Sequence, residues 1–425
     1  MTISISRITA VKLLTTLYKG ELIDVESKIA ALIPDKRDAE LCQKIVLGTV
    51  EKDEELCERI NSVSKTPVCK MRPILASNIK ASLYQLLYLD SIPDFAAVNE
   101  AVAITKKLVS PSLAGFTNAV IRNACRAASE YKVKSESARY CLPDWIISSF
   151  KRDYGVENAT RLCEGFLQKT ADIIRINNLK TNAAELKEHY GERIRILNEN
   201  AAEFIFDGDV TEDELFQKGF FHFQNCSSQL CAKALSPKEN DVILDSCASP
   251  GGKSFTLAEE VNDKAVIDSV DVSEKKAEKI KSGAQRLGIT SINAVVADST
   301  VFQSGREYDK ILCDVPCSGL GQLRKRPYFK LKNESDLSGL PELQYKIASN
   351  CVKMLKKGGT LVYSTCTLRE EENGAVVKRL LESGELEIAK IDCEIENVIN
   401  KNNMLTVIPN GSYEGFFVAK LIKKG

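Results

Sequence analysis

The stretch VILDSCASPGGKSFTLAEE, Val242–Glu260, decides the fold. Its first five residues are a short apolar run ending in an acid and a serine, and its last residues have a helical pattern. This order predicts a buried strand, a tight turn and a helix. The turn holds Pro250, Gly251 and Gly252. Glycines let the backbone approach a ligand closely, and the amides of a helix N-terminus favour anionic groups. The alternative is a simple strand–helix turn, which needs one glycine at most.

The same alternation of strands and helices continues along the chain. Apolar runs at 265–272, 292–298, 308–314 and 359–365 alternate with helical patterns at 274–287 and 342–355. Regular alternation predicts a doubly wound, mostly parallel sheet, in which ligands bind at the carboxyl ends of the strands. Those expected ends carry Asp245, Asp271, Asp298, Asp314 and Thr365.

The acids at the strand ends favour a nucleoside-containing cofactor. Asp271 lies where an acid can hold ribose hydroxyls, and Asp298 lies where one can face an adenine amino group. Each acid alone is more often a helix cap, because DVSE and DST are typical N-cap sequences. A phosphate loop would need a glycine at Cys247, and the dinucleotide fingerprint GxGxxG is absent. S-adenosylmethionine (SAM) is therefore the best candidate.

Two cysteines follow later strands, in CDVPCSGLG (Cys313–Gly321) and YSTCT (Tyr363–Thr367). A thiolate that adds to carbon 6 of a pyrimidine makes carbon 5 nucleophilic enough to accept a methyl group. A carboxylate near ring nitrogen 3 assists as negative charge develops. Asp314, Cys317 and Cys366 fit this scheme, although either cysteine can instead be buried packing. Spacing and strand order alone do not decide which thiol attacks.

Composition gives broad limits on location and partners. The chain has 425 residues and a formal net charge of zero, which neither supports nor excludes RNA binding. Fourteen cysteines without a CxxC pair, and only two histidines, predict reduced thiols and no metal site. No apolar run approaches the roughly 18 residues of a membrane span. We expect a cytoplasmic monomer without membrane contact.

Three domains are predicted from the changes of pattern. Residues 1–130 are helical throughout, and a polar linker follows. Residues 143–235 mix helices and strands and form a small α+β connector. Residues 236–425 form the α/β domain.

Three motifs resemble the signatures of the RNA cytosine-C5 methyltransferases of the NOL1/NOP2/Sun family. They are CASPGGKS, CDVPCSGLGQLRKRP and YSTCTLREEEN. The resemblance implies a Rossmann-like SAM methyltransferase domain in which Cys366 is the nucleophile, Cys317 assists product release and Asp314 is catalytic. It also implies SAM contacts from Cys247, Ala248, Ser249, Pro250, Gly251, Gly252, Lys253, Asp271, Asp298 and Asp314.

The N-terminal half extends the resemblance. LYQLLYLDSIPDFAAVNEAV and AGFTNAVIRN are similar to the NusB-like helical domain of the bacterial Sun subgroup. RINNLK and FHFQNCSSQL are similar to its connector. That subgroup methylates a cytosine in 16S ribosomal RNA, so the resemblance implies this substrate, in a single-stranded or loop region. Alternatives are a transfer RNA cytosine-C5 methyltransferase and a non-catalytic NusB-like RNA-binding or antitermination factor.

A basic segment, LRKRPYFK, directly follows the first cysteine motif. Basic and stackable side chains together suit an unpaired or flipped base. The alternative is a solvated basic loop. The predicted RNA contacts are Arg324, Lys325, Arg326, Tyr328 and Lys330.

Overall fold

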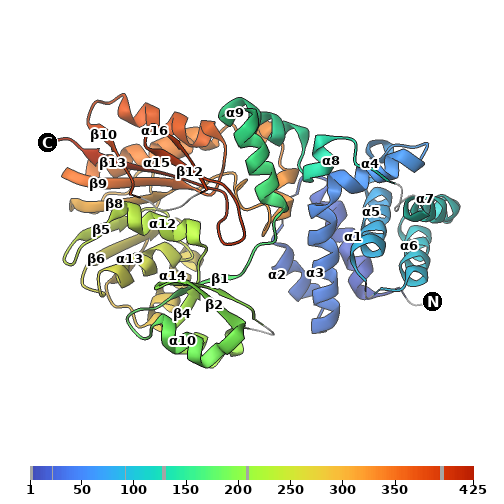
Figure 1. Cartoon of the computed structure of the whole chain (residues 1–425), viewed down its shortest axis with the longest axis horizontal. Coiled ribbons are helices and arrows are strands. Elements are labelled where there is room, and N and C mark those ends of the chain that lie inside the picture. The colour runs from blue at the N-terminus through green and yellow to red at the C-terminus, as the bar shows by residue number, and fades with distance from the viewer. Residues whose placement is uncertain (1–2, 22, 91, 127–130, 207–209, 393–396) are drawn as a thin grey trace. The chain divides into compact units, whose positions relative to one another are not determined.

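A computed structural model describes residues 3–21, 23–90, 92–126, 131–206, 210–392 and 397–425. The chain forms two compact units (Figure 1). The helical unit comprises Met1–Lys151 together with Leu323–Glu334, and the second unit comprises Arg152–Gln322 and Ser335–Gly425. This division differs from the predicted one in assigning residues 143–151 and 323–334 to the helical unit.

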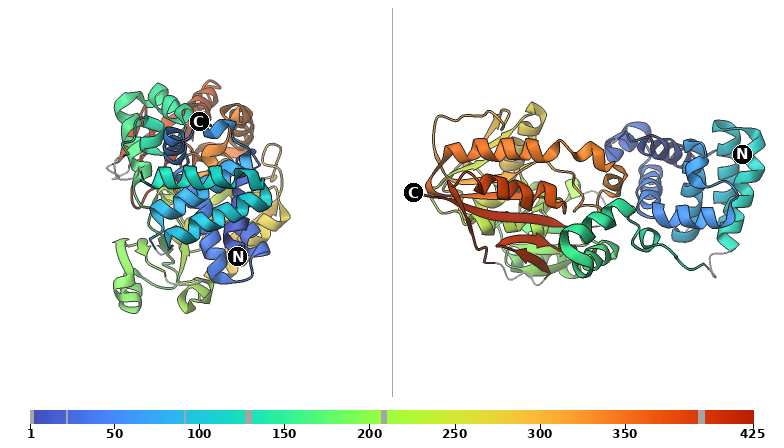
Figure 2. Two further views of the ribbon diagram at one scale, coloured as in Figure 1. Left: turned by 90° about the vertical axis from the view of Figure 1, so that its right-hand side faces the viewer. Right: turned by 90° about the horizontal axis from the view of Figure 1, so that it is seen from above.

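The helical unit is a bundle of α-helices, as predicted (Figure 2). The helix Lys36–Glu51 buries one face, whereas the helix Pro73–Tyr88 is buried on all sides over residues 75–83 and forms the centre of the bundle. Asp24 and Asp35 accept backbone N–H groups at the starts of two of the helices. The helices are α1 Ile5–Leu17, α2 Val25–Leu32, α3 Lys36–Glu51, α4 Asp53–Val63, α5 Pro73–Tyr88, α6 Asp94–Leu108, α7 Ala114–Arg126 and α8 Glu136–Tyr140.

The short 3₁₀ helix η5, Pro327–Leu331, is built into the helical unit. Tyr328 and Leu331 pack against the apolar core formed by helices α1 to α3. Lys330 is 3% exposed, and its ammonium donates to the carbonyls of Glu51 at 3.0 Å and Cys141 at 2.7 Å. Burial lowers the pKa of Lys330. This position contradicts the predicted RNA contact of Lys330, because its ammonium is buried and hydrogen-bonded to two carbonyls of the helical unit.

The second unit contains the predicted doubly wound sheet. Its strand order is β11-β12-β13-β9-β8-β5-β6-β7, with β10 paired to β13. The neighbours among β5 to β9 run parallel, whereas β13 runs antiparallel to β9. The strands are β5 Val242–Asp245, β6 Val266–Asp271, β7 Ile292–Val296, β8 Tyr308–Asp314, β9 Leu355–Thr365, β10 Leu386–Ala389, β11 Val398–Lys401, β12 Met404–Val407 and β13 Phe416–Lys423.

Helices cover both faces of this sheet (Figures 1 and 2). On one face α12 Cys226–Leu235, α13 Gly252–Glu260 and α14 Glu274–Leu287 bury a core that includes Phe255 and Leu312. On the other face α15 Leu340–Met354 and α16 Gly374–Leu381 bury a core that includes Tyr308 and Tyr363. Both cores are apolar on the sheet side, which explains the near-continuous apolar strands in the sequence.

The connector is a four-stranded antiparallel sheet of order β2-β3-β1-β4. It is preceded by α9 Asp144–Leu167, which is interrupted at Gly155. Its strands are β1 Ile173–Ile176, β2 Ile194–Asn198, β3 Ala201–Phe204 and β4 Phe221–Phe223, with α10 Ala183–Tyr190 packed against them.

Buried charges join the connector to α13. Arg175 of β1 is 2% exposed, and its guanidinium contacts Glu259 at 2.5 Å and Glu260 at 2.8 Å. His222 of β4 lies 3.3 Å from the other oxygen of Glu259. Because the glycine turn leads directly into α13, this network ties the connector to the turn.

Candidate active site

The glycine turn lies at the end of β5, as predicted. Asp245 ends this strand fully buried, and its carboxylate accepts a hydrogen bond from Ser254 at 2.7 Å. Burial raises the pKa of Asp245 to about 6, and the charge of Asp314 acts in the same direction. Gly251 precedes α13 with φ +111°, and a Cβ there would overlap the ring of Phe255. Only glycine fits this position without strain.

The side chains of Cys247 and Ala248 face the protein interior. Ala248 belongs to the core under α12 to α14, and Cys247 packs against the core on the opposite face. Burial raises the pKa of the Cys247 thiol well above its ordinary value. The exposed surface of the turn is provided by the residues that follow, of which Pro250 is exposed and Ser249, Gly252 and Lys253 are half-buried.

Gln224 is a site residue that the sequence did not predict. Its amide donates to the carbonyl of Gly252 at 3.0 Å and accepts from the hydroxyl of Thr256 at 2.7 Å. The side chain is buried and fixes the first turn of α13 from the connector side. The sequence offered a weak signal, because Gln224 lies in the FHFQNCSSQL segment that resembles the family connector.

Two of the acids predicted to bind the cofactor, Asp271 and Asp298, have different surroundings in the structure. Asp271 ends β6, is buried, and accepts the backbone N–H of Ser249 at 3.3 Å, which brings it to the glycine turn. Asp298 follows β7, is exposed, and accepts both the N–H and the hydroxyl of Thr300. These two bonds lower the pKa of Asp298. Residues 299–307 form no helix, so Asp298 closes a turn with Thr300 and is not the helix cap that its DST sequence predicted.

Asp314, at the end of β8, lies in a charged contact with the turn. The ammonium of Lys253 is 2.6 Å from its Oδ2, and the hydroxyl of Ser364 donates to its Oδ1 at 2.8 Å. Burial is the largest single effect and lowers the pKa of Lys253, but the charge of Asp314, its hydrogen bond and the charges of two cysteines together outweigh burial, and the net pKa is raised. An ammonium–carboxylate pair therefore stands where the glycine turn meets β8.

The two predicted cysteines lie side by side. The Sγ atoms of Cys317 and Cys366 are 3.1 Å apart and share a hydrogen bond. This bond and burial raise the pKa of the Cys317 thiol well above its ordinary value. This shift of the pKa favours the thiol form of Cys317, and either sulfur can donate the hydrogen of the shared bond.

Close backbone packing holds the two cysteine loops together. The N–H of Gly321 donates to the carbonyl of Cys366 at 2.9 Å, and its carbonyl accepts the N–H of Gly415 at 3.0 Å. A Cβ at Gly321 would overlap the carbonyl oxygen of Gly415. The SGLG sequence therefore lets three backbone segments meet beside Cys366.

The basic segment belongs to the helical unit. Lys325 and Arg326 are exposed and Arg324 is half-buried, so their charged groups are accessible to a polyanion. Tyr328 is half-buried against the helical core. The structure therefore separates three accessible basic residues from the buried Lys330.

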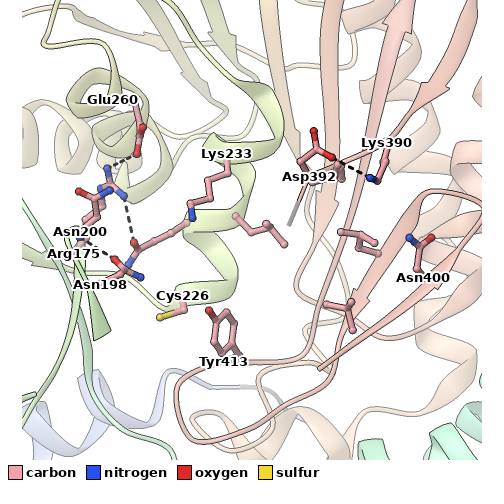
Figure 3. A pocket seen from close by; sticks show the side chains of 15 residues that line it. Arg175, Asn198, Asn200, Cys226, Lys233, Glu260, Lys390, Asp392, Asn400 and Tyr413 are labelled. Atoms are coloured by element: carbon pink, nitrogen blue, oxygen red, sulfur yellow. Dashed lines mark hydrogen bonds and ion pairs between the residues drawn. The ribbon is translucent and has the colours of Figure 1, made fainter. Parts of the chain in front are cut away.

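A cavity of about 770 Å³ lies elsewhere in the second unit, between the connector, α12 and the β11–β12 hairpin (Figure 3). Its charged groups are mostly paired with one another, Arg175 with Glu260 and Lys390 with Asp392 at 3.3 Å. Neither cysteine of the candidate active site lines it.

Among the described residues, none of the helices combines the length and the apolar character that a membrane span requires. The same residues contain no group of three or more histidine, cysteine or acidic side chains arranged to hold a metal ion.

The chain matches two family models and several known proteins. The models are those of the 16S rRNA methyltransferase RsmB/F, over residues 232–422, and of the NusB family, over residues 4–126. The chain is 33% identical to the probable ribosomal RNA small subunit methyltransferase B of Bacillus subtilis (strain 168), over 91% of this chain and 90% of that protein. It is 32% identical to the protein of the same name from Synechocystis, over 92% of each.

Solved structures share the fold. PH0851 superposes over the full length of both chains with a TM-score of 0.79 and 21% identity. NSun6 from Pyrococcus horikoshii with SFG matches 66% of this chain and 98% of its own, with a TM-score of 0.59 and 23% identity. The expected NusB-like domain and Rossmann-like methyltransferase domain are thus confirmed. With about one third of the residues identical to curated relatives over nine-tenths of its length, the chain belongs to the RsmB/F family of 16S rRNA methyltransferases.

Proposed function

We propose that this protein methylates carbon 5 of a cytosine in 16S ribosomal RNA, through a covalent bond between Cys366 and carbon 6 of the base. The observation that carries the proposal is the pair of thiols 3.1 Å apart, in a site that also holds the Lys253–Asp314 ion pair. A protein that only binds RNA has no need of this arrangement.

The residues divide the reaction between them. Cys366 adds as a thiolate to carbon 6, and Asp314 assists by donating or sharing a proton at ring nitrogen 3 as negative charge develops there. Lys253 and Ser364 hold the carboxylate of Asp314 in place. After methylation, a base removes the proton from carbon 5, the bond between carbon 6 and the Cys366 sulfur breaks so that the thiolate leaves, and Cys317 assists this release.

The glycine turn fits SAM as the cofactor. Asp271 presents a buried carboxylate at the end of β6, a suitable acceptor for ribose hydroxyls, and the turn beside it lets a ligand approach the backbone. The proposed contacts are residues 247–253, Asp271, Asp298 and Asp314. When bound, SAM supplies the methyl group.

We also propose that Arg324, Lys325 and Arg326 bind the RNA backbone near the target. Their exposure and charge support this role. Tyr328, half-buried against the helical core, is proposed only to support this segment.

Radiolabelled SAM and ribosomal RNA from cells that lack this methylation test the function. Wild-type protein is expected to label a cytosine in 16S RNA. Cys366→Ala is expected to lose activity and form no covalent complex, whereas Cys317→Ala is expected to accumulate a protein–RNA adduct stable to denaturing electrophoresis. Adduct formation by Cys366→Ala would overturn the assignment of the nucleophile. Labelling of transfer RNA instead of 16S RNA would replace the substrate, and no labelling of either would leave an RNA-binding role.

A further inference from the structure

Two adjacent buried residues, Glu372 and Asn373, lie behind the cysteine loops. Both are 0% exposed, and they connect the 3₁₀ turn Glu370–Glu372 to the start of α16. The hydroxyl of Tyr363 donates to the carbonyl of Glu372 at 2.6 Å and fixes the backbone between them. A fully buried carboxylate is costly unless it is hydrogen-bonded, so its partners indicate its role.

Glu372 holds the backbone on both sides of Cys317. Its Oε2 accepts the N–H of Ser318 at 2.8 Å and the amide of Gln344 at 3.0 Å. The same amide nitrogen of Gln344 donates to the carbonyl of Pro316 at 3.0 Å. The residues before and after Cys317 are thus tied, directly or through Gln344, to one carboxylate oxygen.

Asn373 holds the loop of Cys366 in the same way. Its Oδ1 accepts the hydroxyl of Thr365 at 2.6 Å, and its Nδ2 donates to the carbonyl of Thr367 at 3.0 Å. The hydroxyls of Ser318 and Thr367 share a further bond of 2.7 Å, which links the two loops. Each cysteine therefore has both chain neighbours fixed by one of two consecutive residues.

The negative charge of Glu372 also affects the pKa of the Cys317 thiol. It is among the causes that raise the pKa of Cys317, after the bond to Cys366, burial and the charge of Cys366. A buried anion beside Cys317 opposes its ionisation and so favours the state in which Cys317 carries the shared hydrogen.

We propose that Glu372 and Asn373 are positioning residues that together set the separation of the two thiols, Glu372 through the Cys317 loop and Asn373 through the Cys366 loop. This inference rests on the proposed function for its catalytic consequence, but the positioning itself is measurable without substrate. Because the two residues act on different cysteines, their loss is expected to have opposite effects on the covalent intermediate.

Disulfide formation measures the positioning directly. Diamide, a diazene oxidant, takes up the two thiol hydrogens and becomes a hydrazine while Cys317 and Cys366 form a disulfide. Glu372→Leu, Gln344→Leu and Asn373→Leu are each expected to form it roughly tenfold more slowly than wild type, since each loses about two hydrogen bonds. Glu372→Gln retains an oxygen that can accept both bonds, so it is expected to keep a near wild-type rate.

Glu371→Leu is the matched control, because Glu371 is the preceding residue in the chain and contacts the surface Arg152 at 2.6 Å. It also contacts Arg369 at 3.6 Å, which in turn lies 3.7 Å from Glu372, so this variant controls for effects that pass through Arg369. It is expected to form the disulfide at the wild-type rate. Thermal unfolding of every variant identifies those that are simply unfolded, and rates are compared only among folded ones. Wild-type rates in folded Glu372→Leu and Asn373→Leu proteins would overturn the proposal, and so would an equally slow Glu371→Leu.

The RNA assay then separates the two residues. Asn373→Asp, which cannot donate to Thr367, is expected to lose adduct formation in the Cys317→Ala background. Glu372→Leu is expected to accumulate adduct in a chain that retains Cys317, with kcat lowered and KM for RNA little changed. Adduct behaviour identical in the two variants would overturn the division of roles. If Cys317→Ala itself forms no adduct, the proposed function fails while the diamide result still decides the positioning.

Discussion

At the scale of single residues, the candidate site sets the protonation of its acids through their surroundings. Asp245 is enclosed at the end of β5, and burial raises its pKa to about 6. Asp298 is exposed and accepts two bonds from Thr300, which lower its pKa. The pKa values of these two acids, which follow strands β5 and β7 of one sheet, thus shift in opposite directions.

The raised pKa of Asp245 predicts a pH-dependent stability. The folded protein holds the proton more tightly than the unfolded chain, so this contribution is full below about pH 4 and is lost as the pH rises through about 6. Above that pH, Asp245→Asn is expected to raise the free energy of unfolding by on the order of 2–3 kcal/mol relative to wild type. The asparagine oxygen can still accept from Ser254.

Urea unfolding at pH 5 and pH 8 measures this difference. The advantage of Asp245→Asn is expected to be larger at pH 8, and Glu307→Gln, which removes one exposed acid, controls for net charge. If Asp245→Asn raises the free energy of unfolding by the same amount at both pH values, burial does not raise the pKa of Asp245.

The sequence predicted the acids and cysteines of the site but not the residues that hold them. Asp271, Asp314 and the two cysteines are found at strand ends because the period of the strands places them there. Gln224 and Glu372 lie in segments that resemble the family, but the sequence assigned no role to either residue. Their roles arise from contacts 28 to 54 positions away in the chain, which local pattern does not encode.

At the scale of secondary-structure elements, the connector sheet and helix α13 depend on one buried ion network. Arg175→Met would leave Glu259, which is 4% exposed, without its guanidinium partner. Breaking a buried pair by removing one member costs about 3–5 kcal/mol. We expect a loss of stability of that order, together with weaker cofactor binding because α13 begins at the glycine turn.

Arg195→Met is the matched control on the same sheet. The side chain of Arg195 is 69% exposed and pairs with Glu203, so we expect little change in the free energy of unfolding. Chemical unfolding and SAM titration of both variants check the prediction. Equal destabilisation by the two substitutions would show that the buried network contributes no more to stability than the exposed Arg195–Glu203 pair.

Some helices and strands were predicted more accurately than others, and the difference has a physical reason. Helix α14 was predicted with its observed bounds, because its buried residues repeat at helical spacing and Gly288 ends it. Strands β10 to β12 were not predicted at all. These antiparallel strands at the sheet edge are four residues each, and such short runs have too few alternations to be distinguished from loops.

At the scale of the whole molecule, the chain leaves the second unit after Gln322 and returns to it at Ser335. The intervening segment folds with the helical unit, where Lys330 contacts the carbonyl of a residue 279 positions earlier. Composition and motif gave no indication of this, since LRKRPYFK has the appearance of a uniformly basic loop. Burial divides its lysines into the buried Lys330, which supports the fold, and the exposed Lys325.

Lys330→Met and Lys325→Met form a pair that tests this division. Lys330→Met leaves the carbonyls of Glu51 and Cys141 without their donor, and each unsatisfied buried group costs about 1–3 kcal/mol. It is expected to lower the melting temperature without changing how RNA affinity depends on salt. Lys325→Met removes an exposed charge, so it is expected to leave the melting temperature unchanged and to reduce the salt slope by about 0.7, the contribution of one phosphate contact to a single strand.

Fluorescence anisotropy with a 16S RNA fragment at several potassium chloride concentrations, combined with thermal unfolding, gives both quantities for each variant. A reduced salt slope in a fully stable Lys330→Met protein would show that this lysine reaches RNA and that its buried position is not the one used in solution. An unchanged slope in Lys325→Met would remove Lys325 from the proposed RNA contacts. Because the two substitutions delete the same charge five positions apart, any difference between them arises from burial and not from composition.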